Sequence, residues 1–300
     1  MTGDVVQDLR VETVVLGSGP VALAHALFTA RTAPVILRCR PPATVPAVES
    51  VPAPLLALLL EVGVTPAELD VDHLTTNRLV AWDAPTPIER QSPACAHLDR
   101  AALAGALWRR VQACPNIQIL QPKPRTPAST TGAEVTGPGW TADRLIDATG
   151  RRAITAHRHA RPSPAWIATC WTLKRDDLDP TMRLAAGPTG YAYRLGSARW
   201  LTVGWVAPGP PPRDAVQLHR RLDEEGAGWL IEGVDFQQSS CSRRVASLDI
   251  PIVTRRPDVV AIGDAALARD ALASQGTSIG LSDARLAAKR TTLHDLERRR

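Results

Sequence analysis

Short apolar runs alternate with a longer segment of helical periodicity near the start of the chain. Residues 14–16 are apolar, and the two glycines of a tight turn follow them. Apolar positions then recur at helical spacing over residues 20–31, before a second apolar run at 34–38. This pattern predicts a strand, a helix and a second strand within residues 11–40, which is the βαβ unit of a parallel sheet.

The same alternation of helices and buried strands continues outside the middle of the chain. Residues 41–54 are rich in proline and are predicted to form a loop. Apolar positions recur at helical spacing between Leu98 and Val111, which predicts a helix there. Asp99 is a suitable N-cap for this helix, because a carboxylate accepts hydrogen bonds from free backbone N–H groups. The other predicted elements are helices at 53–62 and from 276 towards 290, and strands at 117–120, 144–148 and 258–262.

Residues 152–250 carry a different pattern. In three runs, at 166–173, 190–195 and 200–206, apolar and polar residues tend to alternate. The segment also contains five tryptophans. A period of two predicts antiparallel strands with one buried face. A helix is predicted at about residues 214–225, so this segment should form a smaller sheet with a helix.

The glycine turn after the first strand has the spacing Gly17-x-Gly19-x-x-Ala22. Such a turn allows a dinucleotide pyrophosphate to lie against the helix N-terminus, where free N–H groups and the helix dipole favour negative charge. An acidic residue that binds the ribose is expected about 20 positions further on, but Arg38 stands there. An arginine at this place can contact a 2′-phosphate, stack on an adenine or remain solvated.

The composition is that of a globular protein and excludes several functional classes. The 300 residues, 44% of them hydrophobic, suffice for one large or two intimate domains. The five cysteines include no C-x-x-C pair, so we expect neither a metal site nor a disulfide framework. The net charge of +5 comes from scattered arginines, whereas nucleic-acid-binding proteins concentrate positive charge on one face.

The sequence also shows no membrane or export segment. No apolar run approaches the ~18 residues that a membrane-spanning helix needs. The first residues lack a charged region followed by an apolar one, so they do not resemble a secretory signal. We therefore expect a cytoplasmic protein that binds neither membranes nor nucleic acid.

Five short motifs follow one another along the chain. They are the glycine turn with Pro20, Leu98-Asp-Arg-x-x-Leu103, Asp147-Ala-Thr-Gly-Arg151, Ile262-Gly-Asp-Ala-Ala266 and Ser274-Gln-Gly-x-x-x-x-Leu281. Their order resembles the FAD-dependent monooxygenase superfamily of the aromatic hydroxylase type. Glu49-Ser-Val-Pro52, before a leucine-rich helix and Gly63, is similar to the signature of its tryptophan-halogenase-like branch. That branch includes flavoproteins that modify tryptophan during quinone-cofactor maturation.

The resemblance implies an α/β fold in which a Rossmann-like FAD-binding domain carries an inserted antiparallel-sheet substrate domain. The FAD-binding domain would be discontinuous and comprise residues 1–63, 95–155 and 250–300. The substrate domain would comprise residues 64–94 and 156–249.

The resemblance also assigns residues to the cofactor. The glycine turn would hold the FAD pyrophosphate, and the helix that begins at residue 276 would face the pyrimidine end of the flavin. The residues expected to bind FAD are Gly17, Gly19, Pro20, Arg38, Arg100, Gly150, Gly263, Asp264, Gln275, Gly276 and Thr277.

Glu49 is the candidate catalytic acid or base, because it lies in the branch signature. The alternative is a structural carboxylate that precedes a helix and complements its dipole.

The implied reaction is hydroxylation of an electron-rich aromatic, such as a tryptophan or tyrosine side chain of a peptide or protein. Halogenation is disfavoured, because Pro46 replaces the lysine of halogenases and Tyr191-x-Tyr193-x-x-Gly196 replaces their Trp-x-Trp-x-x-Pro motif. The chain has no second Gly-x-Gly-x-x-Gly unit, so electrons would come from transiently bound NAD(P)H or a separate flavin reductase.

Two other classes of function stay open. One is an FAD-dependent dehydrogenase or reductase that inserts no oxygen. The other is a degenerate, non-catalytic relative that binds a partner, a hypothesis motivated by Arg38 and by Ala271, which replaces the usual proline of the last motif.

Overall fold

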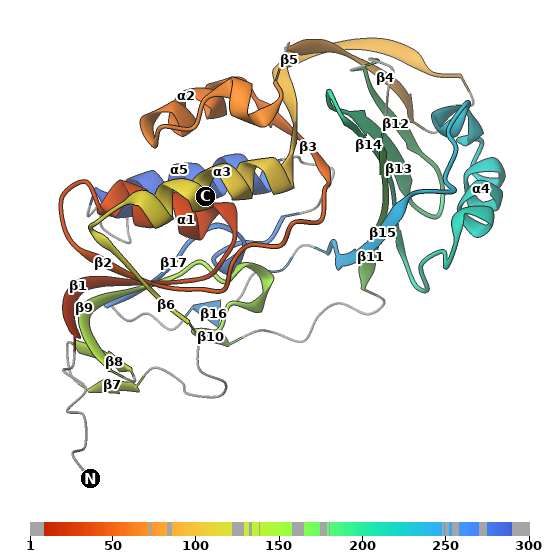
Figure 1. The fold of residues 1–300 in the computed structure, drawn as a ribbon. Helices are drawn as coiled ribbons and strands as arrows, with labels where there is room; N and C mark the ends of the chain where they lie inside the picture. The colour runs from red at the N-terminus through yellow and green to blue at the C-terminus, as the bar shows by residue number, and fades with distance from the viewer. Residues whose placement is uncertain are drawn as a thin grey trace.

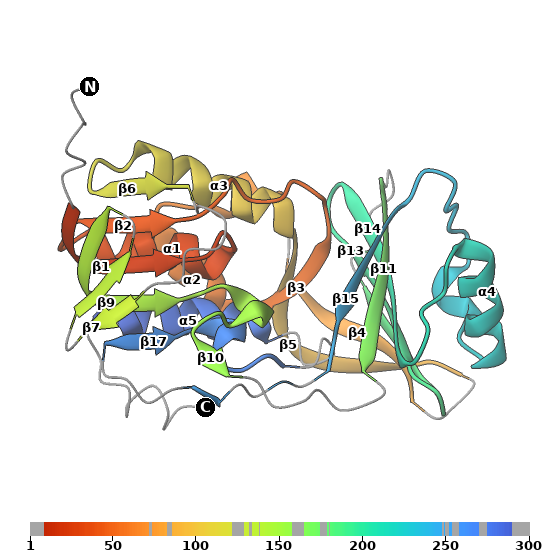
Figure 2. The ribbon, with the colours of Figure 1, turned by 90° about the horizontal axis from the view of Figure 1, so that it is seen from below.

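Two β-sheets, each covered by helices, lie side by side in the computed structural model of the chain (Figure 1). The first sheet forms one lobe with helices α1, α3 and α5, and the second sheet forms the other lobe with α4. The view from below shows the same division (Figure 2). The structure describes residues 9–71, 74–82, 86–121, 129–131, 134–137, 139–157, 165–174, 179, 181–247, 249, 252–253, 258–269 and 275–289.

The first sheet has a parallel core in the order β6-β2-β1-β9, and β17 also pairs in parallel with β9. The strands β8 and β7 extend it as antiparallel strands. Val14 and Val15 of β1 are fully buried on opposite faces, one packed near Trp140 and the other beneath the helices. The strands are β1 (Leu9–Leu16), β2 (Val35–Arg38), β6 (Ile117–Leu120), β7 (Ser129–Thr131), β8 (Glu134–Gly137), β9 (Trp140–Asp147) and β17 (Val259–Ala261).

Helices α1 (Pro20–Thr29), α3 (Arg100–Ala113) and α5 (Gly276–Ala288) cover one face of this sheet, with α2 (Pro54–Glu61) beyond them (Figure 1). Helices α1 and α5 run parallel, since the Val21 side chain lies over Gly280 and His25 bonds to Ala284 one turn further along each helix. Their N-termini therefore lie at the same edge of the sheet.

His25 joins these two helices inside the core. It is 1% exposed, its Nδ1 donates to the carbonyl of Ala284 at 2.8 Å, and the Thr29 hydroxyl lies 3.3 Å from its Nε2. Burial lowers the pKa of His25 from 6.5 to about 4, because a charged imidazole would lose its hydration there. The imidazole is therefore neutral in the folded protein at neutral pH.

We expect acid to destabilise the fold through His25. As the pH falls from 6.5 towards about 4, only the unfolded state takes up this proton, so the free energy of unfolding should fall by about 3 kcal/mol. Urea denaturation at pH values across this interval measures the effect. A His25→Gln variant should lose less stability on acidification, and equal losses in both proteins would contradict the assignment.

The second sheet has the strand order β15-β11-β14-β13-β12-β4-β5-β3, in which only β12 and β4 pair in parallel among the described strands. One face packs against α4 (Ala215–Glu224) and the 3₁₀ helix η3 (Gly228–Ile231), with Trp171 and Trp205 buried between them. The strands are β3 (Val48–Pro52), β4 (Thr75–Trp82), β5 (Ile88–Asp99), β11 (Trp166–Lys174), β12 (Met182–Ala186), β13 (Tyr191–Gly196), β14 (Trp200–Pro208) and β15 (Ser240–Val245).

Short elements complete the described chain. They are the 3₁₀ helices η1 (Pro66–Leu69), η2 (Gly150–Arg152) and η4 (Gly263–Ala265), and the paired strands β10 (Ala156–His157) and β16 (Ile252–Val253). No helix in the described ranges combines the length and apolar content needed to cross a bilayer.

The predicted α/β fold, with a parallel sheet and a largely antiparallel one, is confirmed. The predicted helix starts, which depend on a few consecutive residues, agree with the structure. Helix α1 begins at Pro20 as predicted, and Asp99 caps α3 by accepting the N–H of Ala101 at 2.9 Å.

The prediction of a loop at residues 41–54 was wrong in part. Residues 48–52 form β3, which pairs with residues 95–99 of β5, a strand of 12 residues that the sequence pattern did not reveal. The partner strand lies far away in sequence and supplies the hydrogen bonds that a local pattern cannot show. Both segments join the second sheet, although each continues into a helix of the first lobe, so the predicted division into two domains stays a prediction.

Candidate functional site

Three strands of the parallel sheet end next to one another. The end of β1 pairs with the end of β9, which pairs with the end of β17. The motif glycines Gly17, Gly150 and Gly263 lie in the turns that follow these strands. Open α/β sheets bind their ligands at this carboxyl edge.

The two glycines of the first turn have different roles. Gly17 has a φ of +135°, and a Cβ there would lie 2.3 Å from the carbonyl oxygen of Ala148, so packing alone requires glycine. Gly19 has an ordinary extended conformation, and a Cβ there would meet nothing within 4 Å. Helix α1 begins with Pro20, and no side chain caps its N-terminus.

The N-terminus of α5 is similar. Its N-cap residue, Gln275, makes no capping side-chain hydrogen bond and instead accepts from Arg269 at 3.1 Å. A Cβ at Gly276 would lie 3.5 Å from Oδ1 of Asp264, which brings two of the five motifs together. Two parallel helices thus point positive ends towards the same edge.

Asp147 shapes the turn after β9. It is fully buried, and its two oxygens accept hydrogen bonds from the backbone N–H and the hydroxyl of both Thr149 and Thr155, at 2.6–3.0 Å. These four donors satisfy both oxygens of the buried carboxylate and fix the course of the turn.

Arg151, to which sequence reasoning gave no role, ties this turn to its neighbours. Its guanidinium donates to the carbonyls of Ser247 and Arg269 at 2.7 Å each, and its Nε lies 3.8 Å from Oδ2 of Asp264. Its place at the end of the Asp147-Ala-Thr-Gly motif was the available signal.

Glu49 lies where the two lobes meet. Its Oε2 accepts a hydrogen bond from the hydroxyl of Thr277 at 2.8 Å, and its Oε1 lies 3.1 Å from Nη1 of Arg100. These three residues come from β3, the start of α3 and the first turn of α5. The structure therefore brings the candidate catalytic residue into contact with two of the residues expected to bind the cofactor.

The sheet face next to Glu49 is lined by aromatic and sulfur-containing side chains. The N–H of Val48 donates to the Thr202 hydroxyl at 3.0 Å, which fixes β3 to this face. We call Trp166, Cys170, Tyr191 and Tyr193 the aromatic wall; these residues share one partly buried cluster.

Two contacts order the aromatic wall. The rings of Trp166 and Tyr191 stack with centroids 6.3 Å apart, and the Tyr193 hydroxyl lies 3.2 Å from the Cys170 sulfur. Burial raises the pKa of Tyr193 above its usual value, and the Cys170 thiol and the charge of Glu49 add to the shift. In the sequence, Tyr191 and Tyr193 stood out only as departures from a halogenase motif. The register of β13, β14 and β11 shows that they lie on the same sheet face as Cys170.

Arg38 occupies the position at which an acidic residue was expected to bind the ribose, but its side chain packs against the protein. Its carbonyl accepts the N–H of Gly17 at 3.2 Å, while its guanidinium lies 5.7 Å from the ring centre of Trp140. Burial lowers the pKa of Arg38. The side chain packs on an indole of the protein itself, so contact with a nucleotide stays a prediction for this residue.

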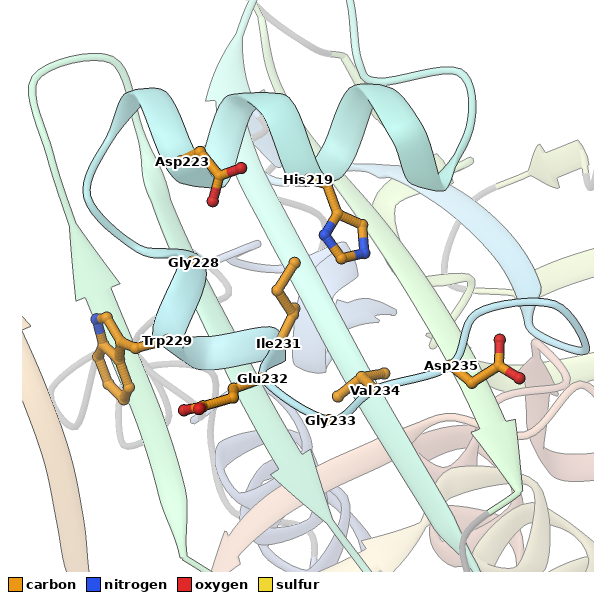
Figure 3. A pocket seen from close by; sticks show the side chains of 9 residues that line it. All are labelled: His219, Asp223, Gly228, Trp229, Ile231, Glu232, Gly233, Val234 and Asp235. Atoms are coloured by element: carbon orange, nitrogen blue, oxygen red, sulfur yellow. The ribbon is translucent and has the colours of Figure 1, made fainter.

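A cavity of about 530 Å³ lies on the other side of the second sheet, between α4 and the segment after η3 (Figure 3). It contains none of the motif residues, and it lies on the face of Trp171, opposite to that of Cys170. Its three carboxylates are spread around the rim (Figure 3). The lining residues with polar side chains or rings are His219, Asp223, Trp229, Glu232 and Asp235.

Comparison with known proteins relies on structure, since no family model and no curated protein sequence matches the chain. The peptidyl tryptophan dihydroxylase QhpG, essential for tryptophylquinone cofactor biogenesis, is 22% identical with a TM-score of 0.71, and the match covers 97% of this chain and 68% of that one. The chain has the fold of flavin-dependent monooxygenases and halogenases. The p-nitrophenol 4-monooxygenase PnpA from Pseudomonas putida is 16% identical (TM-score 0.73; 97% and 82% covered), and the flavin-dependent brominase Bmp2 is 13% identical (TM-score 0.70; 94% and 78% covered).

These likenesses confirm, at the level of the fold, the resemblance to FAD-dependent aromatic hydroxylases and halogenases that the motifs indicated.

Proposed function

We propose that the protein is an FAD-dependent monooxygenase that hydroxylates an electron-rich aromatic ring, such as a tryptophan or tyrosine side chain of a peptide or protein. The observation that carries the proposal is the position of Glu49. It connects the carboxyl edge of the parallel sheet, through Thr277 and Arg100, to the β3 strand beside the aromatic wall.

The residues at the carboxyl edge fit an extended dinucleotide. Open space in front of Gly19 and Gly150 leaves room for a pyrophosphate against the N-terminus of α1. Asp264 offers a carboxylate to ribityl hydroxyls, and Arg100 offers a cation beside them. The first turn of α5 adds free N–H groups that suit the anionic, pyrimidine end of a flavin.

In this proposal the FAD-binding domain comprises residues 1–63, 95–155 and 250–300, and the substrate domain comprises residues 64–94 and 156–249. The two strands β3 and β5 connect them.

FAD, when bound and reduced, would supply the two electrons that activate O2, so that one oxygen atom of O2 enters the ring and the other leaves as water. The protein's own contributions are binding, orientation and proton transfer. The aromatic wall binds the substrate ring and excludes water from it. Arg100 and Thr277 hold the Glu49 carboxylate, which would receive at Oε2 the proton that the ring carbon loses on hydroxylation. Electrons would come from NAD(P)H or from a separate flavin reductase.

Titration of the purified protein with FAD tests the cofactor. We expect a stable visible flavin spectrum after gel filtration. A protein that stays colourless after incubation with FAD would overturn the proposal and favour the non-catalytic binding protein.

Isotope labelling tests the reaction. With labelled O2, a reductant and an aromatic substrate, we expect one labelled oxygen in the product. Turnover without incorporation of oxygen would instead identify a dehydrogenase or reductase.

A further inference from the structure

Arg244 shares a sheet face with the aromatic wall. In the pairing of β15 with β11, Arg244 lies opposite Ala168 and Ser242 lies opposite Cys170. Paired residues of antiparallel strands place their side chains on the same face. Through β14, which pairs with both β11 and β13, Tyr191 lies in the same row as Ala168 and Tyr193 in the same row as Cys170. Strand β15 therefore adds a cation to the end of the aromatic wall.

The neighbouring Arg243 points to the opposite face. Its guanidinium donates to the carbonyls of Pro212 and Arg213, at 3.2 and 3.3 Å, in the segment that leads into α4. Arg243 and Arg244 thus provide a matched pair, with the same charge and the same strand but different faces.

The surroundings of the Arg244 guanidinium differ from those of Arg100. Within the described residues the Arg244 guanidinium makes no hydrogen bond or ion pair, whereas Arg100 is paired with Glu49. Burial lowers the pKa of Arg244, and the positive charge of Arg100 lowers it further. The Glu49 charge raises it, but that carboxylate is already bound by Arg100 and Thr277. The end of the aromatic wall therefore carries a surplus positive charge.

An anion would satisfy this guanidinium. The sheet desolvates part of the Arg244 side chain, but the residue as a whole is exposed to solvent, so a ligand can reach it. The planar fork of a guanidinium matches a carboxylate with two parallel hydrogen bonds, and such charged bonds are stronger next to apolar surface than in water.

We propose that Arg244 binds a carboxylate carried by the aromatic substrate, while the aromatic wall binds its ring. This inference rests on the proposed function, because it names the class of substrate for that same site. The carboxylate has two sources, a free aromatic acid or an acidic residue beside the aromatic side chain of a peptide.

Equilibrium dialysis with two pairs of probes tests the proposal. The first pair is indole-3-acetate and 3-methylindole, and the second is acetyl-Glu-Trp-amide and acetyl-Gln-Trp-amide. The proteins are the wild type, Arg244→Gln, Arg244→Lys and the control Arg243→Gln. We expect the wild type and Arg243→Gln to bind the carboxylate of at least one pair about ten- to a hundredfold more tightly than its neutral partner.

Arg244→Gln should abolish this preference, and Arg244→Lys should retain part of it, since the charge remains without the fork. A preference confined to one pair identifies the source of the carboxylate and supports the proposal. Equal binding of both members of both pairs by the wild type would overturn it, and so would equal losses in Arg244→Gln and Arg243→Gln.

Binding is measured with and without FAD, so a failure of this inference is distinguishable from a failure of the proposed function. A protein that takes up FAD but shows no carboxylate preference contradicts only the role of Arg244.

Discussion

Gly17→Ala is expected to lower the free energy of unfolding by about 3 kcal/mol or more, whereas Gly19→Ala is expected to lower it by less than about 1 kcal/mol. The first variant would combine a φ of +135° with a Cβ that lies 2.3 Å from the carbonyl oxygen of Ala148. The backbone at Gly17 and at Ala148 would have to move to make room. The second variant adds a methyl group in open space at the N-terminus of α1.

The FAD affinity of Gly19→Ala tests the position of the pyrophosphate, because this variant should fold normally. Its methyl group would occupy the space in which we place the pyrophosphate, and FAD affinity should fall about ten- to a hundredfold. Chemical denaturation and FAD titration of both variants measure the two effects separately. Unchanged FAD affinity in Gly19→Ala would show that the pyrophosphate does not lie against α1.

Glu49→Gln is expected to reduce the rate of aromatic hydroxylation by roughly 10²- to 10⁴-fold while the protein keeps its FAD. The amide can still accept a hydrogen bond from Thr277, so the strand and helix stay in place, but it cannot take up a proton. Hydroxylation rate and flavin absorbance are measured on the same samples.

Glu61→Gln is the matched control for this variant. Glu61 of α2 also pairs with an arginine across the lobe, Arg285 of α5 at 2.8 Å, but it lies outside the site. Loss of this ion pair in Glu61→Gln should leave the hydroxylation rate within about threefold of the wild-type rate, because a partly exposed ion pair contributes little energy. Should Glu49→Gln behave in the same way with its flavin intact, Glu49 would be a structural carboxylate that holds the starts of α3 and α5.

The sequence predicted those parts of the site that depend on local chemistry. The turn at Gly17, the cap at Asp99 and the start of α5 at Gly276 each follow from a few consecutive residues. The motif order also predicted the fold, because each motif ends a strand or begins a helix at one edge of the sheet.

Features that depend on pairing between distant segments could not be predicted. The strand β3 exists because residues 95–99 lie beside it, and neither segment has a strong strand pattern alone. The position of Arg38 on Trp140 and the shared face of Arg244 and Cys170 likewise result from the register between strands that are far apart in sequence.

The paired strands β3 and β5 have a mechanical consequence. Each runs from the second sheet almost directly into a helix of the first lobe, β3 into α2 and β5 into α3. At this place two hydrogen-bonded strands cross between the lobes, and a hinge rotation there would break their ladder. Glu49 is itself part of this crossing, so we expect its carboxylate to keep its distance from both lobes as substrate and product enter and leave.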